Sequence, residues 1–148
     1  MKILATLVTI ALIGFQAAAA QSITVTTNVD RLDGMVTVKL YNSADGWAKD
    51  EPIKVAVEIL PAQAAAGVRS SSRRVVFIDL PPGQYAVGIH HDLNYDLRLN
   101  TDFFGKPVEP FGISNSPNLQ RGKKPTFNEA SFTLANQNLQ LLVPFYGQ

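Results

Sequence analysis

The chain has 148 residues, with 13 Lys and Arg against 12 Asp and Glu, and it contains no cysteine. A nearly neutral chain has no overall field that would draw it to nucleic acid or to an acidic membrane, so the composition argues against both partners. The absence of cysteine excludes a disulfide framework, and a domain of this length must therefore be stabilised by its own hydrophobic core.

The N-terminus has the pattern of a Sec-type signal peptide. Lys2 supplies the positive charge, Ile3 to Phe15 form an apolar run, and Ala17 to Ala20 offer small residues for cleavage. The run is shorter than the roughly 20 residues that a membrane-spanning helix needs. We therefore expect cleavage after the last alanine, with a signal peptide over residues 1–20 and one exported domain over residues 21–148. The alternative is an uncleaved N-terminal anchor.

Beyond this segment, apolar and polar residues alternate with a period of two, as in strands with one buried and one exposed face. The alternation predicts seven strands, over residues 23–29, 36–41, 53–59, 74–80, 85–89, 132–134 and 139–145. In the run over 74–80, apolar residues occur on both faces of the strand. This strand is therefore expected at the centre of a sheet. One short helix is expected around Ala62 to Ala66.

The turn residues agree with these strands. Asp33-Gly34 predicts a hairpin between the first two strands, and Pro81-Pro82-Gly83 predicts a tight turn between the fourth and fifth. Seven short alternating strands favour an all-β fold, a single-domain antiparallel sandwich of the transthyretin or immunoglobulin type with one long ordered loop.

Two long segments depart from the strand pattern. Ser43 to Pro52 contains Trp47, the one tryptophan of the chain, and Asp92 to Glu129 is much longer. A long segment without regular structure is uncommon inside a compact domain and is usually functional. A functional site is therefore expected in the longer segment.

Side chains with oxygen atoms recur at every second position near the start of that segment. They are Asp92, Asn94, Asp96, Asn100 and Asp102. Calcium-binding loops present oxygen ligands in this rhythm. However, Leu97 stands where such loops have a glycine, and Phe103 stands where they have a closing glutamate. Two interpretations follow: a calcium site, or a loop whose Asp and Asn side chains cap their own backbone as Asx-turns.

Two adjacent histidines precede the loop. On a strand, His90 and His91 point to opposite faces, so they are not expected to chelate one ion. We expect one of them to bond to the long loop and the other to lie at a sheet edge.

Gly112 to Ser116 nearly matches the nucleophile-elbow motif, but Ser116 replaces its last glycine and no strand-to-helix pattern surrounds it. Ser114 and Asn115 are therefore expected to form a turn, and no catalytic set is expected. The basic clusters around Arg73 and Lys124 are expected in solvated loops.

A set of motifs gives the chain a family resemblance. They are Leu80-Pro81-Pro82-Gly83-x-Tyr85, His91-Asp92-x-Asn94, Phe104-Gly105-x-Pro107-x-Glu109 and Phe111-Gly112-x-Ser114-Asn115. Their order, from Ile23 to Tyr146, resembles a family of exported bacterial proteins classed as domain of unknown function 2141. The first motif is also similar to prealbumin-like sandwich modules.

The family resemblance implies an exported β-sandwich with no established activity. It also implies a loop in which a glycine usually stands at position 97 and an aspartate at position 100, where this chain has Leu97 and Asn100.

Together these observations predict a non-enzymatic binding or interaction module of the cell envelope, periplasmic or secreted, with an unidentified envelope or extracellular partner. The expected binding platform comprises His91, Asp92, Asn94, Asp96, Asn100, Asp102, Ser114 and Asn115. One alternative is a structural envelope protein that self-associates through a sheet edge. Another is a hydrolase that uses His91 and Asp92 beside Ser114.

Overall fold

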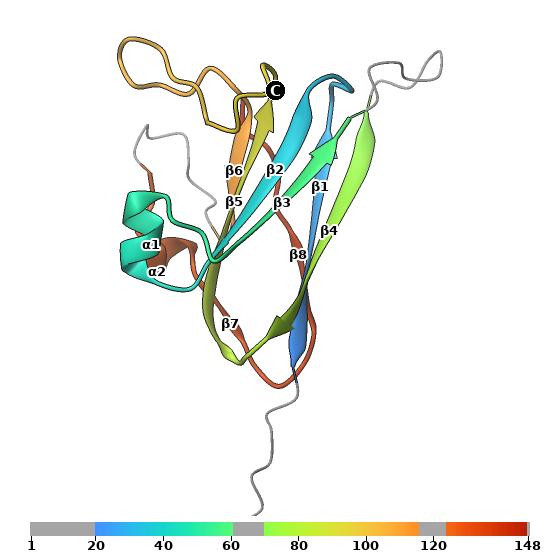
Figure 1. Ribbon diagram of the computed structural model, residues 1–148, viewed down its shortest axis with the longest axis vertical. Helices are drawn as coiled ribbons and strands as arrows, with labels where there is room; N and C mark the ends of the chain where they lie inside the picture. The colour runs from blue at the N-terminus through green and yellow to red at the C-terminus, as the bar shows by residue number, and fades with distance from the viewer. Residues whose placement is uncertain (1–19, 61–69, 116–123, 148) are drawn as a thin grey trace, which may run out of the picture.

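The computed structural model describes residues 20–60, 70–115 and 124–147, and these form a sandwich of two sheets with two short helices (Figure 1). Within these ranges the elements are β1 (Gln21–Val29), β2 (Met35–Tyr41), α1 (Ala44–Lys49), β3 (Lys54–Ile59), β4 (Ser71–Leu80), β5 (Gly83–Asp92), β6 (Phe111–Ile113), α2 (Phe127–Ala130), β7 (Phe132–Leu134) and β8 (Leu139–Leu142). The predicted all-β sandwich is confirmed, with eight strands instead of seven in the described ranges.

The strands divide into a smaller and a larger sheet. The three-stranded sheet has the order β4-β1-β8, and the five-stranded sheet has the order β3-β2-β5-β6, with β7 paired to the start of β5. All of these pairs are antiparallel except β1 with β8, which are parallel. The expectation of a purely antiparallel sandwich is therefore wrong at this pair. The reason is that the chain leaves β7 in one sheet, crosses the sandwich, and enters the other sheet in the direction of β1.

Two further predictions are corrected by the topology. Asp33-Gly34 does not close a hairpin, because β1 and β2 belong to different sheets. Glycine is still required there, since φ of Gly34 is 79° and a Cβ atom would lie 2.3 Å from the carbonyl oxygen of Asp92. β4 lies at the edge of its sheet and not at the centre, so Val76 and Ile78 are about half exposed.

The connection from β4 to β5 is the expected tight turn at Pro81 and Pro82, and it carries the chain from one sheet to the other. The Tyr85 hydroxyl donates a hydrogen bond to the carbonyl oxygen of Pro81 (2.8 Å), which fixes this turn.

Both helices and β6 lie in the two long segments that the alternation left without structure. α1 begins after Ser43, whose Oγ accepts a hydrogen bond from Gly46 N (3.2 Å). α2 begins after Thr126, which forms a capping box with Glu129. Both caps are recognisable in sequence as Ser or Thr before a short helical segment. The helix expected around Ala62 to Ala66 lies outside the described residues.

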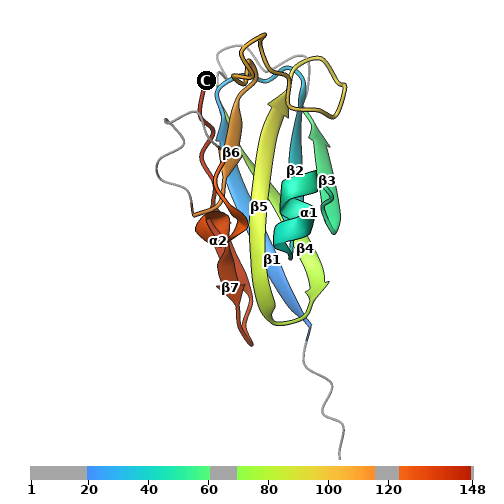
Figure 2. The same cartoon turned by 90° about the vertical axis from the view of Figure 1, so that its left-hand side faces the viewer.

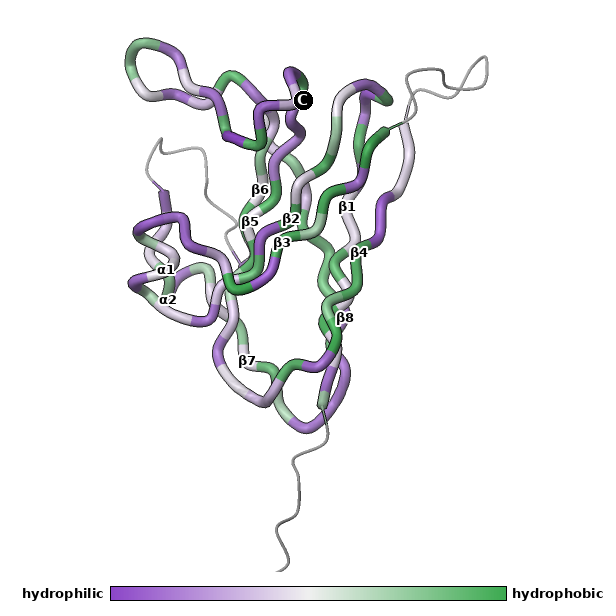
Figure 3. Tube along the Cα trace, viewed as in Figure 1, coloured by the Kyte–Doolittle hydropathy of each residue, from purple (hydrophilic) through white to green (hydrophobic). Residues whose placement is uncertain are grey.

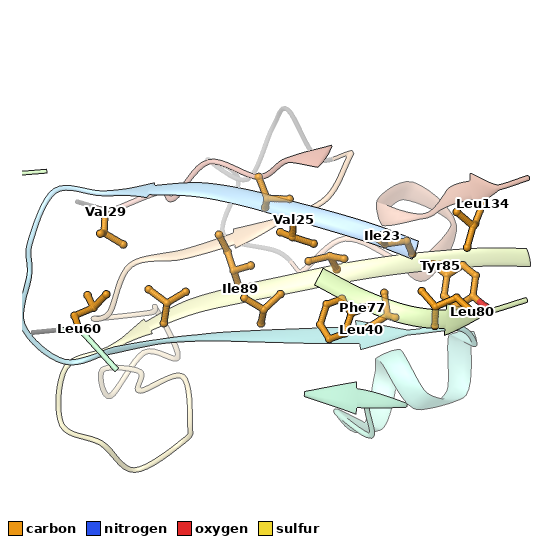
Figure 4. Close-up of a cluster of buried hydrophobic side chains, with 14 residues drawn as sticks. Ile23, Val25, Val29, Leu40, Leu60, Phe77, Leu80, Tyr85, Ile89 and Leu134 are labelled. Carbon is orange, nitrogen blue, oxygen red and sulfur yellow. The ribbon is translucent and has the colours of Figure 1, made fainter. Parts of the chain in front are cut away.

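The core fills the space between the sheets (Figure 4). One parity of β1, β2 and β5 is buried there, together with residues from β4 and the C-terminal segment: Ile23, Val25, Val29, Val36, Val38, Leu40, Phe77, Leu80, Tyr85, Val87, Ile89, Leu134 and Val143. Each large buried apolar side chain stabilises the fold by about 1.5–3 kcal/mol relative to an exposed one. Hydrophobic residues accordingly follow the strands, and hydrophilic residues concentrate in the connections (Figure 3).

β3 reverses this pattern at the edge of the larger sheet. Val55, Val57 and Ile59 are 52%, 45% and 72% exposed, while the other parity carries two charged side chains. These reach β4 of the facing sheet: Lys54 Nζ donates to the carbonyl oxygen of Ile78 (2.6 Å), and Glu58 pairs with Arg73 (3.2 Å). Polar contacts therefore join the two sheets at this edge, and the apolar side of β3 faces outward.

The described residues contain no helix that is long and apolar enough to cross a membrane. The signal-peptide pattern lies outside them except for Ala20.

Candidate functional site

The loop over residues 93–109, here called the motif loop, is organised by Asp92. This carboxylate is fully buried at the end of β5 and accepts hydrogen bonds from three backbone N–H groups of the loop. Its Oδ1 bonds to Asn94 N (3.2 Å) and Tyr95 N (2.6 Å), and its Oδ2 bonds to Leu97 N (2.7 Å). The first half of the loop thus wraps around a single side chain.

Glu109 performs the same task at the other end of the motif loop. It is 6% exposed, and its two carboxylate oxygens accept hydrogen bonds from Leu93 N (2.9 Å) and Asn100 N (3.0 Å). Val108 N also donates to the carbonyl oxygen of Asn100 (3.0 Å). These bonds hold the start, middle and end of the loop together. This structural role of Glu109 was not predicted from the sequence.

The remaining polar residues of the motif loop also bond within it. Asp96 Oδ2 accepts from the side-chain amides of Asn100 (2.9 Å) and Asn94 (3.0 Å), and the bond from Asn100 is the largest cause of the lowered pKa of Asp96. Asp102 Oδ1 accepts from the backbone N–H groups of Phe104 and Lys106, both at 2.9 Å. The bond from Phe104, two residues beyond Asp102, is of the kind that the Asx-turn interpretation predicts.

The loop bends at Tyr95 and Leu97, whose φ angles are 65° and 64°. The left-handed conformation that a glycine would favour at position 97 is therefore present with leucine in place. No group of three His, Cys, Asp or Glu side chains in the described residues is arranged to hold a metal ion. Calcium binding by Asp92, Asn94, Asp96, Asn100 and Asp102 stays a prediction.

The two histidines occupy opposite faces of β5, as expected, but both are buried and neither is at a sheet edge, because β5 lies between β2 and β6. The Nε2 atom of His91 lies 2.6 Å from the carbonyl oxygen of Asp33. Because a carbonyl oxygen only accepts, Nε2 carries the proton. The side-chain partner of His91 is thus the β1–β2 connection and not the motif loop, which corrects the expectation.

Ser114 and Asn115 form the expected turn and fasten β6 to its neighbours. Ser114 Oγ accepts from Val87 N and donates to the carbonyl oxygen of Ala130, both at 2.8 Å. Asn115 Nδ2 donates to carbonyl oxygens on either side of that alanine. His91 lies four residues beyond Val87 along β5, which corresponds to about 13 Å at 3.3 Å per residue. Ser114 is therefore not brought together with His91 and Asp92.

A cleft that was not predicted from the sequence lies on the outer face of the five-stranded sheet, which faces away from the core. The strand register places Lys39 beside Gly88, and Gly88 beside Ile113, on the floor of this cleft. α1 contributes one wall and the motif loop another, and both project from the same side of the sheet (Figure 2). The volume of the cleft is about 400 Å³.

The lining combines apolar and charged side chains. It comprises Lys39, Tyr41, Trp47, Asp50, Gly88, Ile89, His90, Leu99, Thr101, Gly105, Pro107, Phe111, Gly112, Ile113 and Lys124. A Cβ atom on Gly88 would lie 3.7 Å from the nearest atom, in the Tyr41 ring, which is an ordinary contact. Packing therefore does not require glycine there, and its missing side chain leaves the floor open. A glycine inside a strand often marks a close approach by a ligand, and this signal was available in the sequence.

A hydrogen-bonded charged cluster lies among the lining residues of the cleft. Asp50 Oδ1 accepts from the Tyr41 hydroxyl (2.5 Å), and Asp50 Oδ2 accepts from Lys39 Nζ (2.7 Å). Burial is the strongest single influence on the pKa of Asp50 and raises it, but the bonds from Lys39 and Tyr41 and the charges of Lys39 and Lys124 together outweigh burial, so the pKa is lowered. Burial, followed by the bond to Asp50, raises the pKa of Tyr41.

Lys124 and His90 complete the polar part of the lining. Lys124 Nζ donates to the carbonyl oxygen of Trp47 (2.7 Å) and lies 4.5 Å from the centre of the Trp47 ring. His90 is 4% exposed, and its Nε2 has no hydrogen-bond partner in the part of the chain that the structure describes. Burial, assisted by Lys39, lowers the pKa of His90, so the imidazole is neutral at pH 7.

Fold and cleft together define a small β-sandwich protein with a candidate ligand site on the outer face of one sheet. The model of the family described as "Uncharacterized protein conserved in bacteria (DUF2141)" matches residues 23–141, and the chain belongs to this family. The predicted family is thus confirmed. No curated protein and no solved structure matches the chain, and the similarity to prealbumin-like modules is not confirmed.

Proposed function

We propose that this protein is a non-enzymatic binding module of the bacterial cell envelope that holds a small molecule in the cleft between α1 and the motif loop. One observation carries the proposal: a cavity of about 400 Å³ has aromatic and apolar walls and is lined by His90, whose buried Nε2 has no partner among the described residues. Ligand sites have volumes of about 300–1,000 Å³ and combine such walls with a few convergent polar groups. Export rests on the signal-peptide pattern of residues 1–20.

The motif loop supports this function as a scaffold. Asp92 and Glu109 fix its backbone through five hydrogen bonds from backbone N–H groups. The same loop supplies Leu99, Thr101, Gly105 and Pro107 to the wall of the cleft. The predicted platform residues therefore serve the site indirectly, by positioning the wall.

The hydrogen bonds of Ser114, the residue considered as a nucleophile, support a binding function over a catalytic one. Ser114 Oγ both accepts from and donates to backbone groups, and His91 Nε2 donates to a backbone carbonyl. A nucleophile needs a general base within hydrogen-bond reach, and these two side chains are engaged elsewhere.

Filling the cleft tests the proposal. The probe is the neutral apolar dye N-phenyl-1-naphthylamine, followed through its own emission and through quenching of Trp47, the one tryptophan of the chain. We expect wild type and the control Gly88→Ala to bind the dye and Gly88→Leu to bind it at least tenfold more weakly. Urea unfolding checks that both variants are folded. Equal binding by all three proteins, or none by the wild type, contradicts the proposal.

Calcium in the motif loop is a separate prediction with its own experiment. A ligand present at 100 times its dissociation constant adds about 2.7 kcal/mol to the free energy of unfolding. If calcium binds, the wild-type melting temperature rises by several degrees between EDTA and millimolar calcium, and Asp96→Ala abolishes the rise. An unchanged melting temperature contradicts calcium binding and leaves the loop bonded to itself.

The exposed side of β3 favours a second candidate, a structural protein that self-associates. Within the described residues β3 is the last strand of its sheet, and its outward parity carries Val55, Val57 and Ile59. An exposed apolar edge strand is a template for pairing with another chain. Sedimentation at high protein concentration tests this candidate: association that Val57→Lys removes supports it, and a strict monomer contradicts it.

A further inference from the structure

The charges around the cleft indicate which head group its ligand carries. Three lining side chains are charged at pH 7: Lys39, Lys124 and Asp50. Both oxygens of Asp50 already accept hydrogen bonds, from Tyr41 and from Lys39. An ammonium group has three donors, and each lysine donates one hydrogen bond to the described residues, so both have donors left. The two lysines therefore have unused hydrogen-bond donors, and the lining carries one net positive charge. Both features favour a ligand with one negative charge.

His90 is neutral, so it offers the ligand a hydrogen bond without adding a charge to the cleft. Its buried Nε2 lacks a partner in the described ranges, and His90 lies on the same outward parity of β5 as Gly88. A buried polar atom without a partner is costly unless something bonds to it. A ligand oxygen that reaches His90 would satisfy Nε2, while the lysines neutralise the charge of the same head group.

The aromatic residues indicate the body of the ligand. Tyr41 and Trp47 pack edge to face, with ring centres 5.0 Å apart, and Phe111 lines the cleft from β6. The Lys124 ammonium lies over the Trp47 ring, so an anionic group bound to this lysine is held beside an aromatic surface. Aromatic side chains offer flat apolar area that matches a ring or a short hydrocarbon chain.

From these contacts we infer that the ligand is a small monocarboxylate with an aromatic or other flat apolar body. The carboxylate lies between Lys39, Lys124 and His90, and the body packs against Trp47, Tyr41 and Phe111. This inference rests on the proposed function, because it assigns the ligand class of the same cleft. A cationic ligand is disfavoured by the two ammonium groups, and a neutral one leaves the net positive charge of the lining uncompensated.

Three compounds of equal shape and different charge test the ligand class. 3-Phenylpropionate, 3-phenylpropan-1-ol and 3-phenylpropylamine compete with the neutral dye at pH 7. We expect the carboxylate to displace the dye at a concentration at least tenfold lower than the alcohol or the amine. Lys124→Met should remove this preference. The matched control is Lys49→Met, because Lys49 lies on α1 outside the cleft and pairs with Asp45 (2.9 Å); it should keep the preference.

The outcomes separate the ligand class from the proposed function. If the alcohol or the amine displaces the dye as well as the carboxylate does, the ligand class is wrong and the binding site stands. If no compound competes and the dye is insensitive to Gly88→Leu, the proposed function fails as well. If Lys124→Met does not unfold cooperatively, Lys39→Met replaces it, with the same loss of preference expected. A preference retained in the folded lysine variant overturns the inference.

Discussion

Single carboxylates determine the conformation of the motif loop. Asp92 and Glu109 are almost completely buried, yet each is bonded to backbone N–H groups that would otherwise lack partners. A buried charge is tolerated when such bonds replace its hydration. The loop is therefore ordered by two side chains at its ends, although it contains no helix or strand.

Replacing Asp92 should be among the most destabilising changes in the loop. Asp92→Ala removes the acceptor of three backbone N–H groups, and hydrogen bonds to charged groups contribute about 1.5–3 kcal/mol each to stability. Urea denaturation should show a loss of about 3 kcal/mol or more in the free energy of unfolding. The control Asp102→Ala, at an exposed carboxylate, should cost less than about 1 kcal/mol. Equal costs for the two variants contradict the central role of Asp92.

Leu97 offers a stabilising substitution. Its φ angle of 64° is costly for a leucine by about 1–2 kcal/mol, and its side chain is 52% exposed. Leu97→Gly should therefore raise the free energy of unfolding by about 0.5–1 kcal/mol, after allowing for the greater flexibility of glycine in the unfolded chain. Val108→Gly is the matched control, because Val108 is similarly exposed but has an ordinary φ, and it should lower stability. A loss at both positions would contradict strain at Leu97.

At the scale of elements, β6 and α2 depend on each other. β6 has three residues and α2 has four, and neither length forms an independent unit. Ser114 joins them, since its hydroxyl bonds to β5 on one side and to α2 on the other. The wall of the cleft that contains Phe111 and Ile113 is held by this junction.

Ser114→Ala should therefore cost about 1–3 kcal/mol, because it leaves the buried N–H of Val87 and the carbonyl of Ala130 without this partner. Thermal unfolding measures the effect. Ser131→Ala is the control: its hydroxyl donates one exposed bond to Asn128, and its loss should change stability by less than about 0.5 kcal/mol. A Ser114 variant as stable as this control would show that the junction is dispensable.

At the scale of the whole molecule, buried His90 should make stability depend on pH. Burial, then Lys39, lowers the pKa of His90, while Asp92, Glu109 and Asp50 oppose the shift. As the pH falls below the unfolded value of about 6.5, the unfolded chain takes up a proton before the folded one does. His90 therefore contributes stability that is fully present above pH 6.5 and is lost progressively as the pH falls toward its lowered folded pKa.

The free energy of unfolding, measured by urea denaturation between pH 7.5 and 4.5, should decline by up to about 1.4 kcal/mol per pH unit in the wild type. His90→Gln should flatten this decline. The lowered pKa values of Asp33, Asp50 and Asp96 reduce stability only as the pH falls below about 5, so the decline between about pH 7 and 5 reports the histidine. An unchanged slope in the variant would contradict a buried neutral His90.

The sequence by itself determined the elements whose signals are local. Alternation over a few residues marks a strand wherever it occurs, so seven strands were predicted without any contact information, and they correspond to β1 to β5, β7 and β8. The all-β class and the family followed in the same way. The long loop and its Asx-type bonds were recognisable for the same reason, since Asp92, Asp96 and Asp102 bond to residues close in sequence.

Only the tertiary structure decided which sheet each strand joins and which faces enclose a site. Whether Asp33-Gly34 closes a hairpin depends on partners that β1 finds in β4 and β8, far along the chain. The cleft arises because the β2–β5 register brings Lys39 to Gly88, and because distant Lys124 bonds to the backbone of Trp47. Such contacts are decided by the packing of whole sheets, and no short stretch of sequence records them.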